Sequence, residues 1–463
     1  MDKRMISNHT EILELVKKYN VAGPRYTSYP TAVQFTETFD DTILRKAFES
    51  RSKSTDPLSL YFHIPFCFSL CWYCGCTKII TRDQGRGDAY LNYLEKEIRL
   101  VQKTIHPDAP VKQIHFGGGT PTFLTPVQLK RLGELIHSGF TIHGDVEFSV
   151  EIDPRRVEED HIKALRDIGC NRASLGVQDT NEEVQEAIHR IQPFHQTRTI
   201  TELLRKHGIK NINFDLIYGL PKQTTATFSK TIDDVVRLNP DRFAVYSYAH
   251  LPSMMPAQKL LNEDDFPSTH EKLSMMMMAI ERLPELGYEF IGMDHFAKKE
   301  DELSLALKNG TLQRNFQGYS THAKLEMIAL GMSGISQGDD LYYQNEKDLA
   351  RYYAMLDDGK LPIKKVLPLS EEDKLRRNII MQVMCKASIS YEEFSAETGL
   401  NFREQFSDEL ERLKTMEADG LVLLLKDRLT ITDRGRLFLR NIAMVFDGYL
   451  KKKTHRVSYS KTV

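Results

Sequence analysis

Short β-prone runs alternate with longer stretches of helical period from residue 58 to about residue 338. This alternation is typical of β-α units around a parallel sheet. It predicts strands at 58–64, 111–116, 146–152, 172–177, 212–217 and 243–248, and weaker ones at 288–293 and 328–335. Helices are predicted between them, for example at 90–104, 126–137 and 158–168. The series is too long for one flavodoxin-like sheet and favours a full or partial TIM-type barrel.

The predicted strands carry unusual residues at their C-terminal ends. A group of cysteines follows the first strand, and the run Gly117-Gly118-Gly119-Thr120-Pro121 follows the second. The next three strands are followed by Glu151 with Asp153-Pro154, by Gln178-Asp179 and by Gly219-Leu220-Pro221. Because parallel α/β folds place their sites at the C-terminal ends of the strands, these residues predict one site at that edge.

The cysteines are concentrated in one short segment, because four of the six lie between Cys67 and Cys76. The N-terminus has no apolar segment of the kind found in secretory signals and predicts a polar helix, so we expect a cytoplasmic protein. In that reducing compartment clustered cysteines indicate a metal or catalytic site instead of disulfides. Cys170 and Cys385 are expected to be buried as small apolar residues.

Cys67, Cys71 and Cys74 form a CxxxCxxC group directly after the first predicted strand. Three thiolates from one loop suit zinc or an iron–sulfur cluster. A structural zinc would need a fourth ligand, which Cys76 or His63 could supply. A 4Fe-4S cluster held by three cysteines would leave one iron open to bind a reactant. The spacing alone leaves both hypotheses open, although zinc sites usually pair two CxxC knuckles.

The composition excludes several other classes of protein. The chain has 463 residues, with 62 Lys and Arg against 64 Asp and Glu, so it has no overall basic field for nucleic acid. Its apolar runs are too short to span a membrane. No heptad pattern demands a partner, and we expect a monomer. Beyond about residue 364 a charged helical stretch precedes a predicted hairpin at 421–432, which indicates a mostly helical accessory domain.

A few further residues attract attention and have ordinary explanations. The run from Met275 to Met278 predicts flexible core filling, since consecutive helical residues point to different faces. His63, His115 and His295 are expected in the core or beside ligands. Trp72 lies within the cysteine loop and could cover a cluster. Arg25, Tyr26 and Tyr29 could form a surface turn, or could close over a substrate rich in carboxylates.

Many segments together resemble the oxygen-independent coproporphyrinogen III oxidases of the radical S-adenosylmethionine superfamily. They include GPRYTSYPTA, YFHIPFC, CWYCGC, HFGGGTPTFL, EIDPR, LGVQD, DLIYGLPKQT, YAHLP, IGMDHFA, NFQGY and RNIAMVFDGYL, and they run from residue 23 to about 450. The resemblance implies a partial TIM-type barrel of the radical S-adenosylmethionine type at 51–363. It also implies an N-terminal extension at 1–50 that closes over the active site and a C-terminal domain, mostly helical, at 364–463.

The resemblance also implies a set of ligand contacts. Cys67, Cys71 and Cys74 become the ligands of a 4Fe-4S cluster. The positions matching the contacts to the S-adenosylmethionine at the cluster are Tyr61, Gly118, Glu151 and Ile335. The family can hold a second S-adenosylmethionine, and its contacts fall on Tyr73, Gly119, Thr120, Gln178, Arg190, Asp215 and Ala249.

The implied reaction converts two propionates of coproporphyrinogen III to vinyl groups, giving protoporphyrinogen IX in haem biosynthesis through a 5′-deoxyadenosyl radical. It requires a low-potential electron donor such as flavodoxin or ferredoxin, and an electron acceptor. The alternative is a haem chaperone or a haem-modifying radical protein of the same superfamily. Cys76 and the segments RYTSYP and RNIAMVFD argue against a chaperone. One departure from the family, His322-Ala323-Lys324, could alter substrate preference.

Overall fold

The centre of the computed structural model is a mixed sheet of 12 strands, in a chain whose structure is described for residues 9–322, 325–451 and 459–462. The strand order is β16-β15-β14-β13-β1-β4-β5-β6-β7-β8-β10-β9. The strands from β13 to β8 in this order are all parallel. They are β1 (Leu58–Ile64), β4 (Val111–Gly118), β5 (Ile142–Ile152), β6 (Arg172–Gln178), β7 (Asn211–Tyr218), β8 (Arg242–Ser247) and β13 (Glu326–Leu330). The six stronger strand predictions are therefore confirmed.

The two flanks of the sheet are antiparallel and leave the barrel open. On one side β10 (His295–Lys298) pairs with β8 and with β9 (Tyr288–Gly292). On the other side follow β14 (Ile335–Gln337), β15 (Leu341–Asn345) and β16 (Ile363–Pro368). Within the described residues β9 and β16 do not pair with each other, so the barrel is partial.

The weaker prediction of one strand at 328–335 was wrong. The chain turns between β13 and β14, and these two strands pair antiparallel. Gly331 and Ser333 both have positive φ values, of 95° and 61°, which end the extended conformation. The apolar run that suggested a single strand therefore contains a turn, because glycine adopts positive φ at little cost.

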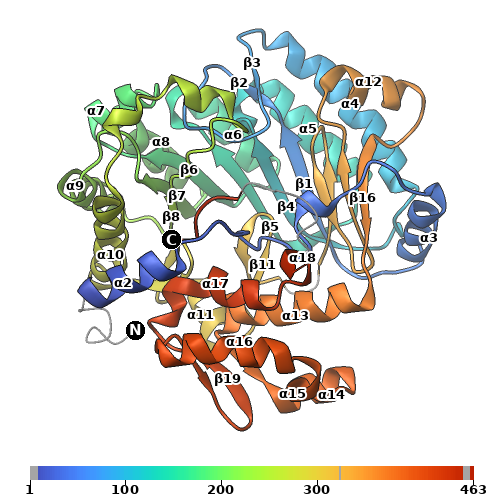
Figure 1. The fold of residues 1–463 in the computed structure, drawn as a ribbon. Coiled ribbons are helices and arrows are strands. Elements are labelled where there is room, and N and C mark those ends of the chain that lie inside the picture. The colour runs from blue at the N-terminus through green and yellow to red at the C-terminus, as the bar shows by residue number, and fades with distance from the viewer. Residues whose placement is uncertain (1–8, 323–324, 452–458, 463) are drawn as a thin grey trace.

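The helices cover the outer face of the sheet (Figure 1). They include α4 (Gly85–Gln102), α5 (Pro126–Gly139), α6 (Glu159–Asp167), α7 (Glu182–Ala187), α8 (Phe194–Lys206), α9 (Thr225–Val236), α10 (Thr269–Glu285), α11 (Glu302–Lys308) and α12 (Leu349–Asp357). α5 shows why they begin where they do, because the hydroxyl of Thr125 caps it, Gln128 completes the capping box and Pro126 is the first helical residue. Its buried face, which includes Leu129, Leu132 and Ile136, packs onto the sheet.

The C-terminal part of the chain forms a smaller helical body that lies across one end of the sheet (Figure 1). Its helices are α13 (Glu371–Lys386), α14 (Tyr391–Thr398), α15 (Phe402–Gln405), α16 (Ser407–Ala418), α17 (Leu439–Val445) and α18 (Gly448–Lys451). The predicted hairpin is formed by β18 (Val422–Leu424) and β19 (Arg428–Ile431), and β17 (Ser388–Ser390) adds a third strand. The expected domain boundary between residues 363 and 364 falls inside β16, which belongs to the large sheet.

The two ends of the described chain lie side by side. α2 (His9–Tyr19) packs beside the C-terminal helices (Figure 1), and Ala22 bridges to Lys461. The buried guanidinium of Arg440 in α17 donates to the carbonyls of Gly23, Pro24 and Lys461. One arginine therefore ties both terminal segments to the C-terminal body. α3 (Asp41–Arg51) then leads into β1. None of the described helices is long and apolar enough to cross a membrane.

Candidate active site

The cysteine loop leaves β1 and passes over the C-terminal edge of the parallel strands. Short strands β2 (Phe66–Cys67) and β3 (Ile79–Ile80) pair and hold its two ends together. Within it Cys71 is buried, Cys67 and Cys74 are half-buried and Cys76 is exposed. The backbone N–H of Trp72 donates to the carbonyl of Ile188 over 3.0 Å, which anchors the loop to the C-terminal end of α7.

Two guanidinium groups approach the central cysteine. Nη2 of Arg155 lies 3.3 Å from Sγ of Cys71, and Nη1 of Arg190 lies 3.5 Å from it. Both arginines also bind Asp153, at 2.6 and 3.3 Å. Burial alone would raise the pKa of Asp153, but Arg190 and Arg155 lower it to about 2. The sulfur therefore lies beside two cations that share one carboxylate, an arrangement suited to thiolate or cluster charge.

The glycine-rich turn at the end of β4 is closely packed on all sides. A Cβ at Gly118, whose φ is 118°, would lie 2.8 Å from the ring of His63. A Cβ at Gly119 would lie 2.7 Å from the carbonyl oxygens of Pro65 and Phe66. The backbone N–H groups of Gly119 and Thr120 donate to the carbonyls of Ile64 and Phe66. Only glycine fits beside the first strand here, which fixes the turn against the cysteine loop.

Glu151 at the end of β5 joins this turn to the neighbouring strands. It accepts hydrogen bonds from the backbone N–H of Gly118 at 3.2 Å and from Nε2 of His115 at 3.3 Å. The ring of His115 stacks on that of Tyr61, with centroids 5.8 Å apart. Burial opposes the charge of Glu151, but the contact with His115 and the amide of Gly118 hold its pKa below the usual value. Glu151 is therefore an anionic acceptor for an ammonium or hydroxyl group.

A second carboxylate faces the same cavity from β7. Asp215 accepts hydrogen bonds from Oγ of Ser174 at 2.9 Å and from Nδ2 of Asn213 at 2.8 Å. Its burial raises its pKa to about 6, and the nearby charge of Glu151 adds to the rise. Glu151 and Asp215 line one cavity of about 130 Å³ inside the partial barrel, the inner cavity. Tyr246, His295 and Tyr319 also line it.

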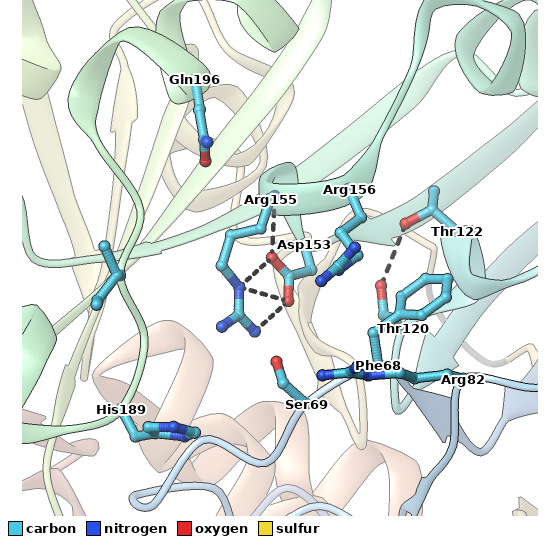
Figure 2. A pocket seen from close by; sticks show the side chains of 11 residues that line it. Phe68, Ser69, Arg82, Thr120, Thr122, Asp153, Arg155, Arg156, His189 and Gln196 are labelled. Carbon is cyan, nitrogen blue, oxygen red and sulfur yellow. Dashed lines mark hydrogen bonds and ion pairs between the residues drawn. The ribbon is translucent and has the colours of Figure 1, made fainter.

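A separate groove of about 500 Å³, the outer groove, lies beside the cysteine loop (Figure 2). Its walls come from the loop, from the turn after β4, from the 3-10 segment Pro154–Arg156 and from the start of α8. Three arginines line it: Arg82, Arg155 and Arg156. Arg156 lies over the ring of Phe68, with its guanidinium carbon 5.4 Å from the centroid. The groove is therefore a cationic surface with one aromatic wall, next to Cys71.

The remaining predicted contacts fall into four places. Thr120 lines the outer groove and its hydroxyl bonds to that of Thr122. Gln178, which has a φ of 67°, and Arg190 both lie against Gly176, whose carbonyl accepts from Arg190 at 2.7 Å. The carbonyls of Tyr73 and Ala249 both accept from Nε2 of Gln258. Ile335 in β14 is half-buried and packs against a small cluster that includes Phe35 and Tyr342.

The N-terminal candidates divide into one residue near the cavity and two that anchor the segment. Arg25 pairs with Asp294 and lies 5.6 Å from the ring centroid of Tyr246. The hydroxyl of Tyr26 donates to Asp447, and that of Tyr29 accepts from the backbone N–H of Gly448. Both tyrosines are 1% exposed, so they fix the segment to the C-terminal body.

The ordinary explanations for the other residues are confirmed where the structure describes them. Met275 and Met277 are fully buried in α10. Cys170 and Cys385 are buried. His63 is buried and bonds to Tyr61 and to the carbonyl of Thr77.

Comparison with known proteins identifies the family. Residues 61–235 match the Radical SAM superfamily, and residues 369–438 match the HemN C-terminal domain. The chain is 45% identical over 452 residues to the oxygen-independent coproporphyrinogen III oxidase of Pseudomonas aeruginosa, covering 97% of this chain and 98% of that protein. The chain belongs to the oxygen-independent coproporphyrinogen III oxidase family. The family member of Escherichia coli is 42% identical over 451 residues, again with 97% and 98% coverage.

A solved structure of the family has the same fold. The coproporphyrinogen III oxidase of Escherichia coli, described as a radical SAM enzyme, superimposes with a TM-score of 0.90 at 41% identity. The match covers 94% of this chain and 98% of that one. The expectation of a radical S-adenosylmethionine partial barrel is therefore confirmed.

Oxygen-independent coproporphyrinogen III oxidases, as radical SAM enzymes, use a 4Fe-4S cluster and S-adenosylmethionine. The donor set of this chain fits a cluster, because Cys67, Cys71 and Cys74 belong to one loop and two arginine side chains offset negative charge at Cys71. No described group of Cys, His, Asp or Glu side chains is arranged to hold a single metal ion. A cluster contains several irons and takes one thiolate at each, so its ligands need not share an ion.

Two features of this family member were missed in the sequence. Arg155 follows Asp153 directly in EIDPR, but only the fold brings its side chain to Cys71, 84 residues away. Arg314 carried no signal in the sequence, because its burial depends on the strand β11 (Gln313–Asn315) and on α13. The departure at His322-Ala323-Lys324 lies partly outside the described residues. His322 itself lies 3.9 Å from Glu147, which lines the inner cavity.

Proposed function

We propose that this chain catalyses the oxygen-independent oxidative decarboxylation of two propionate side chains of coproporphyrinogen III, giving protoporphyrinogen IX. The observation that carries the proposal is the meeting of the cysteine loop, the glycine turn and two carboxylates above one cavity. Curated relatives with that activity in their names are 40% to 45% identical over nearly the whole chain. The reaction belongs to haem biosynthesis.

When bound, the cluster and S-adenosylmethionine supply the 5′-deoxyadenosyl radical that removes a hydrogen atom from the propionate. The protein's part is to hold and orient. Cys67, Cys71 and Cys74 would hold the cluster. Glu151 would accept a hydrogen bond from the amino group of S-adenosylmethionine, and the turn at Gly118 would bring backbone close to it. Asp215 is placed to accept from hydroxyl groups in the same cavity.

The outer groove supports the approach of the electron donor. Its cationic wall of Arg82, Arg155 and Arg156 would attract the acidic surface of a small low-potential protein such as flavodoxin or ferredoxin. Arg155 connects this wall to Cys71 directly. We further propose that the enzyme works in the cytoplasm as a monomer, with no nucleic-acid or membrane partner.

The N-terminal extension, taken as residues 1–50, is proposed to close the open side of the barrel. Arg25 supports this role, since it pairs with Asp294 and lies over Tyr246, a wall of the inner cavity. Tyr26 and Tyr29 support this role indirectly, because they fix the segment that carries Arg25 to Asp447 and Gly448. Closing the cavity would exclude water from the radical.

An anaerobic assay tests the proposal. The iron-reconstituted protein is incubated with S-adenosylmethionine, a reductant and coproporphyrinogen III, and CO2, 5′-deoxyadenosine and the porphyrin product are measured together. We expect protoporphyrinogen IX from the wild type and none from Cys71→Ala, which loses a cluster ligand. Cys170→Ala is the matched control, because Cys170 is buried away from the loop. Formation of 5′-deoxyadenosine without CO2 would contradict the substrate and favour a haem-binding or haem-modifying role.

A further inference from the structure

Arg314 is a buried arginine without a counter-ion among the described residues. It lies in β11 (Gln313–Asn315), opposite Tyr319 of β12 (Gly318–Ser320), and is 8% exposed. Its Nε and Nη1 are buried and make no hydrogen bond. Its one described close partner is an aromatic ring, since the guanidinium carbon lies 4.7 Å from the ring centroid of Tyr319.

This isolation is unusual within the same molecule. The guanidinium of Arg51, which is 6% exposed, binds Glu326, the hydroxyl of Tyr343 and Thr104. Arg172 pairs with Glu147 and Glu302. A buried charge without such partners is strongly unfavourable. Arg314 therefore has two N–H groups that an added anion could satisfy.

The carboxylate of Asp294 does not fill this role. Asp294 lies close enough to influence the pKa values of both His295 and Tyr319, as Arg314 does. However, Asp294 already forms an ion pair with Arg25. Arg314, Arg25 and Arg242 therefore all lie near His295, together with the carboxylate of Asp294. Arg242 is itself paired with Asp301.

Arg314 lies next to the inner cavity, which is lined by the carboxylates of Glu151 and Asp215. The ring of Tyr319, on which it packs, is a wall of that cavity. His295, another wall, meets Tyr319 edge to face with centroids 5.2 Å apart. The Nδ1 of His295 is also buried without a partner. Burial, followed by the charge of Arg314, lowers the pKa of His295 to about 3, so the imidazole is neutral and can share a hydrogen bond.

We infer that Arg314 binds a carboxylate of the substrate, with His295 beside it, at the end of the inner cavity away from the cysteine loop. The inference rests on the proposed function, because coproporphyrinogen III carries four propionates and only two react. Arginine binds carboxylates through two parallel hydrogen bonds, from Nη2 together with either Nε or Nη1, and none of these groups of Arg314 makes a hydrogen bond within the described residues. A propionate held there would fix how the macrocycle presents its reacting side chain.

The size of the cavity sets what can enter it. About 130 Å³ is far less than the roughly 300 to 1,000 Å³ of pockets that enclose whole ligands. It accommodates a propionate arm but not the macrocycle. The macrocycle must therefore lie outside this cavity, with one propionate arm inside it.

The test compares Arg314→Gln and Arg314→Lys with Arg51→Gln in the full-length, cluster-loaded enzyme. For Arg314→Gln we expect the KM for coproporphyrinogen III to rise about tenfold to a hundredfold, since hydrogen bonds to charged groups are lost, with a smaller change in kcat. The KM of Arg314→Lys should lie between those of the wild type and Arg314→Gln, because lysine keeps the charge but not the paired N–H groups.

Thermal stability separates binding from folding. Arg314→Gln should keep or raise the Tm of the ligand-free enzyme, since it removes an uncompensated charge. Arg51→Gln should lower the Tm, because it leaves Glu326 without its cation, and should leave the KM unchanged. The oxidised porphyrin coproporphyrin III should raise the Tm of the wild type more than that of Arg314→Gln.

Two results would overturn the inference. One is a wild-type KM in both Arg314 variants, and the other is a drop in Tm like that of Arg51→Gln without any change in KM. Failure of the proposed function looks different. In that case the wild type itself would form no protoporphyrinogen IX, whatever residue occupies position 314.

Discussion

The backbone N–H of Gly118 donates to the carboxylate of Glu151 over 3.2 Å. This bond joins the turn after β4 to the end of β5 and holds a carboxylate close to the cysteine loop. Gly118 can occupy the position only because it lacks a Cβ, which would lie 2.8 Å from the ring of His63. The turn and the carboxylate therefore form one unit, and changes in either should affect cofactor binding.

Replacing Gly119 by alanine should disrupt this unit. A Cβ there would lie 2.7 Å from two backbone oxygens, of Pro65 and Phe66, which cannot move as a flexible side chain could. We expect a loss of about 1–3 kcal/mol in stability and weaker S-adenosylmethionine binding, measured by Tm and by equilibrium dialysis. Gly144→Ala is the control, because its Cβ would meet nothing within 4 Å. Equal effects of the two substitutions would contradict the close-packing argument.

Arg155→Gln should make the reduction potential of the cluster more negative. The guanidinium lies 3.3 Å from Sγ of Cys71, and a cation beside a sulfur ligand favours the reduced cluster, which carries more negative charge. The potential is measured by an EPR-monitored redox titration. Arg156→Gln is the matched control, because Arg156 lines the same groove but lies over Phe68. The idea fails if both variants shift the potential by the same amount.

Glu97 in α4 predicts a pH dependence of stability. Burial raises its pKa to about 7, although Tyr352, the amide of Gly331 and Asn345 donate to it. The pKa is higher in the folded than in the unfolded state, so the stabilising effect is complete below about pH 4.5. It is lost as the pH rises to about 7, and the total loss is about 3 kcal/mol.

The measurement is the Tm of the wild type minus that of Glu97→Gln, which should fall between pH 5 and pH 8. The variant cannot ionise, so its own stability lacks this contribution. Glu95→Gln, on the same helix but partly exposed, should show no such change. A difference in Tm that is flat across this range would show that Glu97 does not titrate there.

Deleting residues 1–29 should leave the cluster in place and abolish turnover. The deletion removes Arg25, which packs on a wall of the inner cavity, but none of the cysteines. Iron content and protoporphyrinogen formation are the two measurements. Arg25→Ala should reduce turnover by a smaller factor, and Lys17→Ala, at an exposed ion pair of α2, should not reduce it. Full activity of the truncated enzyme would exclude a role in closure.

The sequence alone determined the parallel part of the sheet and the edge at which the site lies. Alternation of β-prone and helical runs is a local signal, and the rule that sites follow C-terminal strand ends turns it into a position for the chemistry. Cys67, Cys71 and Cys74 could be named for the same reason, since their spacing within one short loop is a local feature of the sequence. Resemblance over nearly the whole chain then gave the family.

Only the tertiary structure decided which side chains from distant segments meet. Arg155 reaches Cys71 across the sheet, and Glu151 reaches the amide of Gly118 on the next strand. The turn at Gly331 divided a run of apolar residues into two strands, because positive φ values cannot be read from hydrophobicity. Nothing in the local sequence distinguishes Arg314 from the other arginines. Its lack of a counter-ion exists only after folding, since burial and the absence of a partner are properties of packed neighbours and not of local sequence.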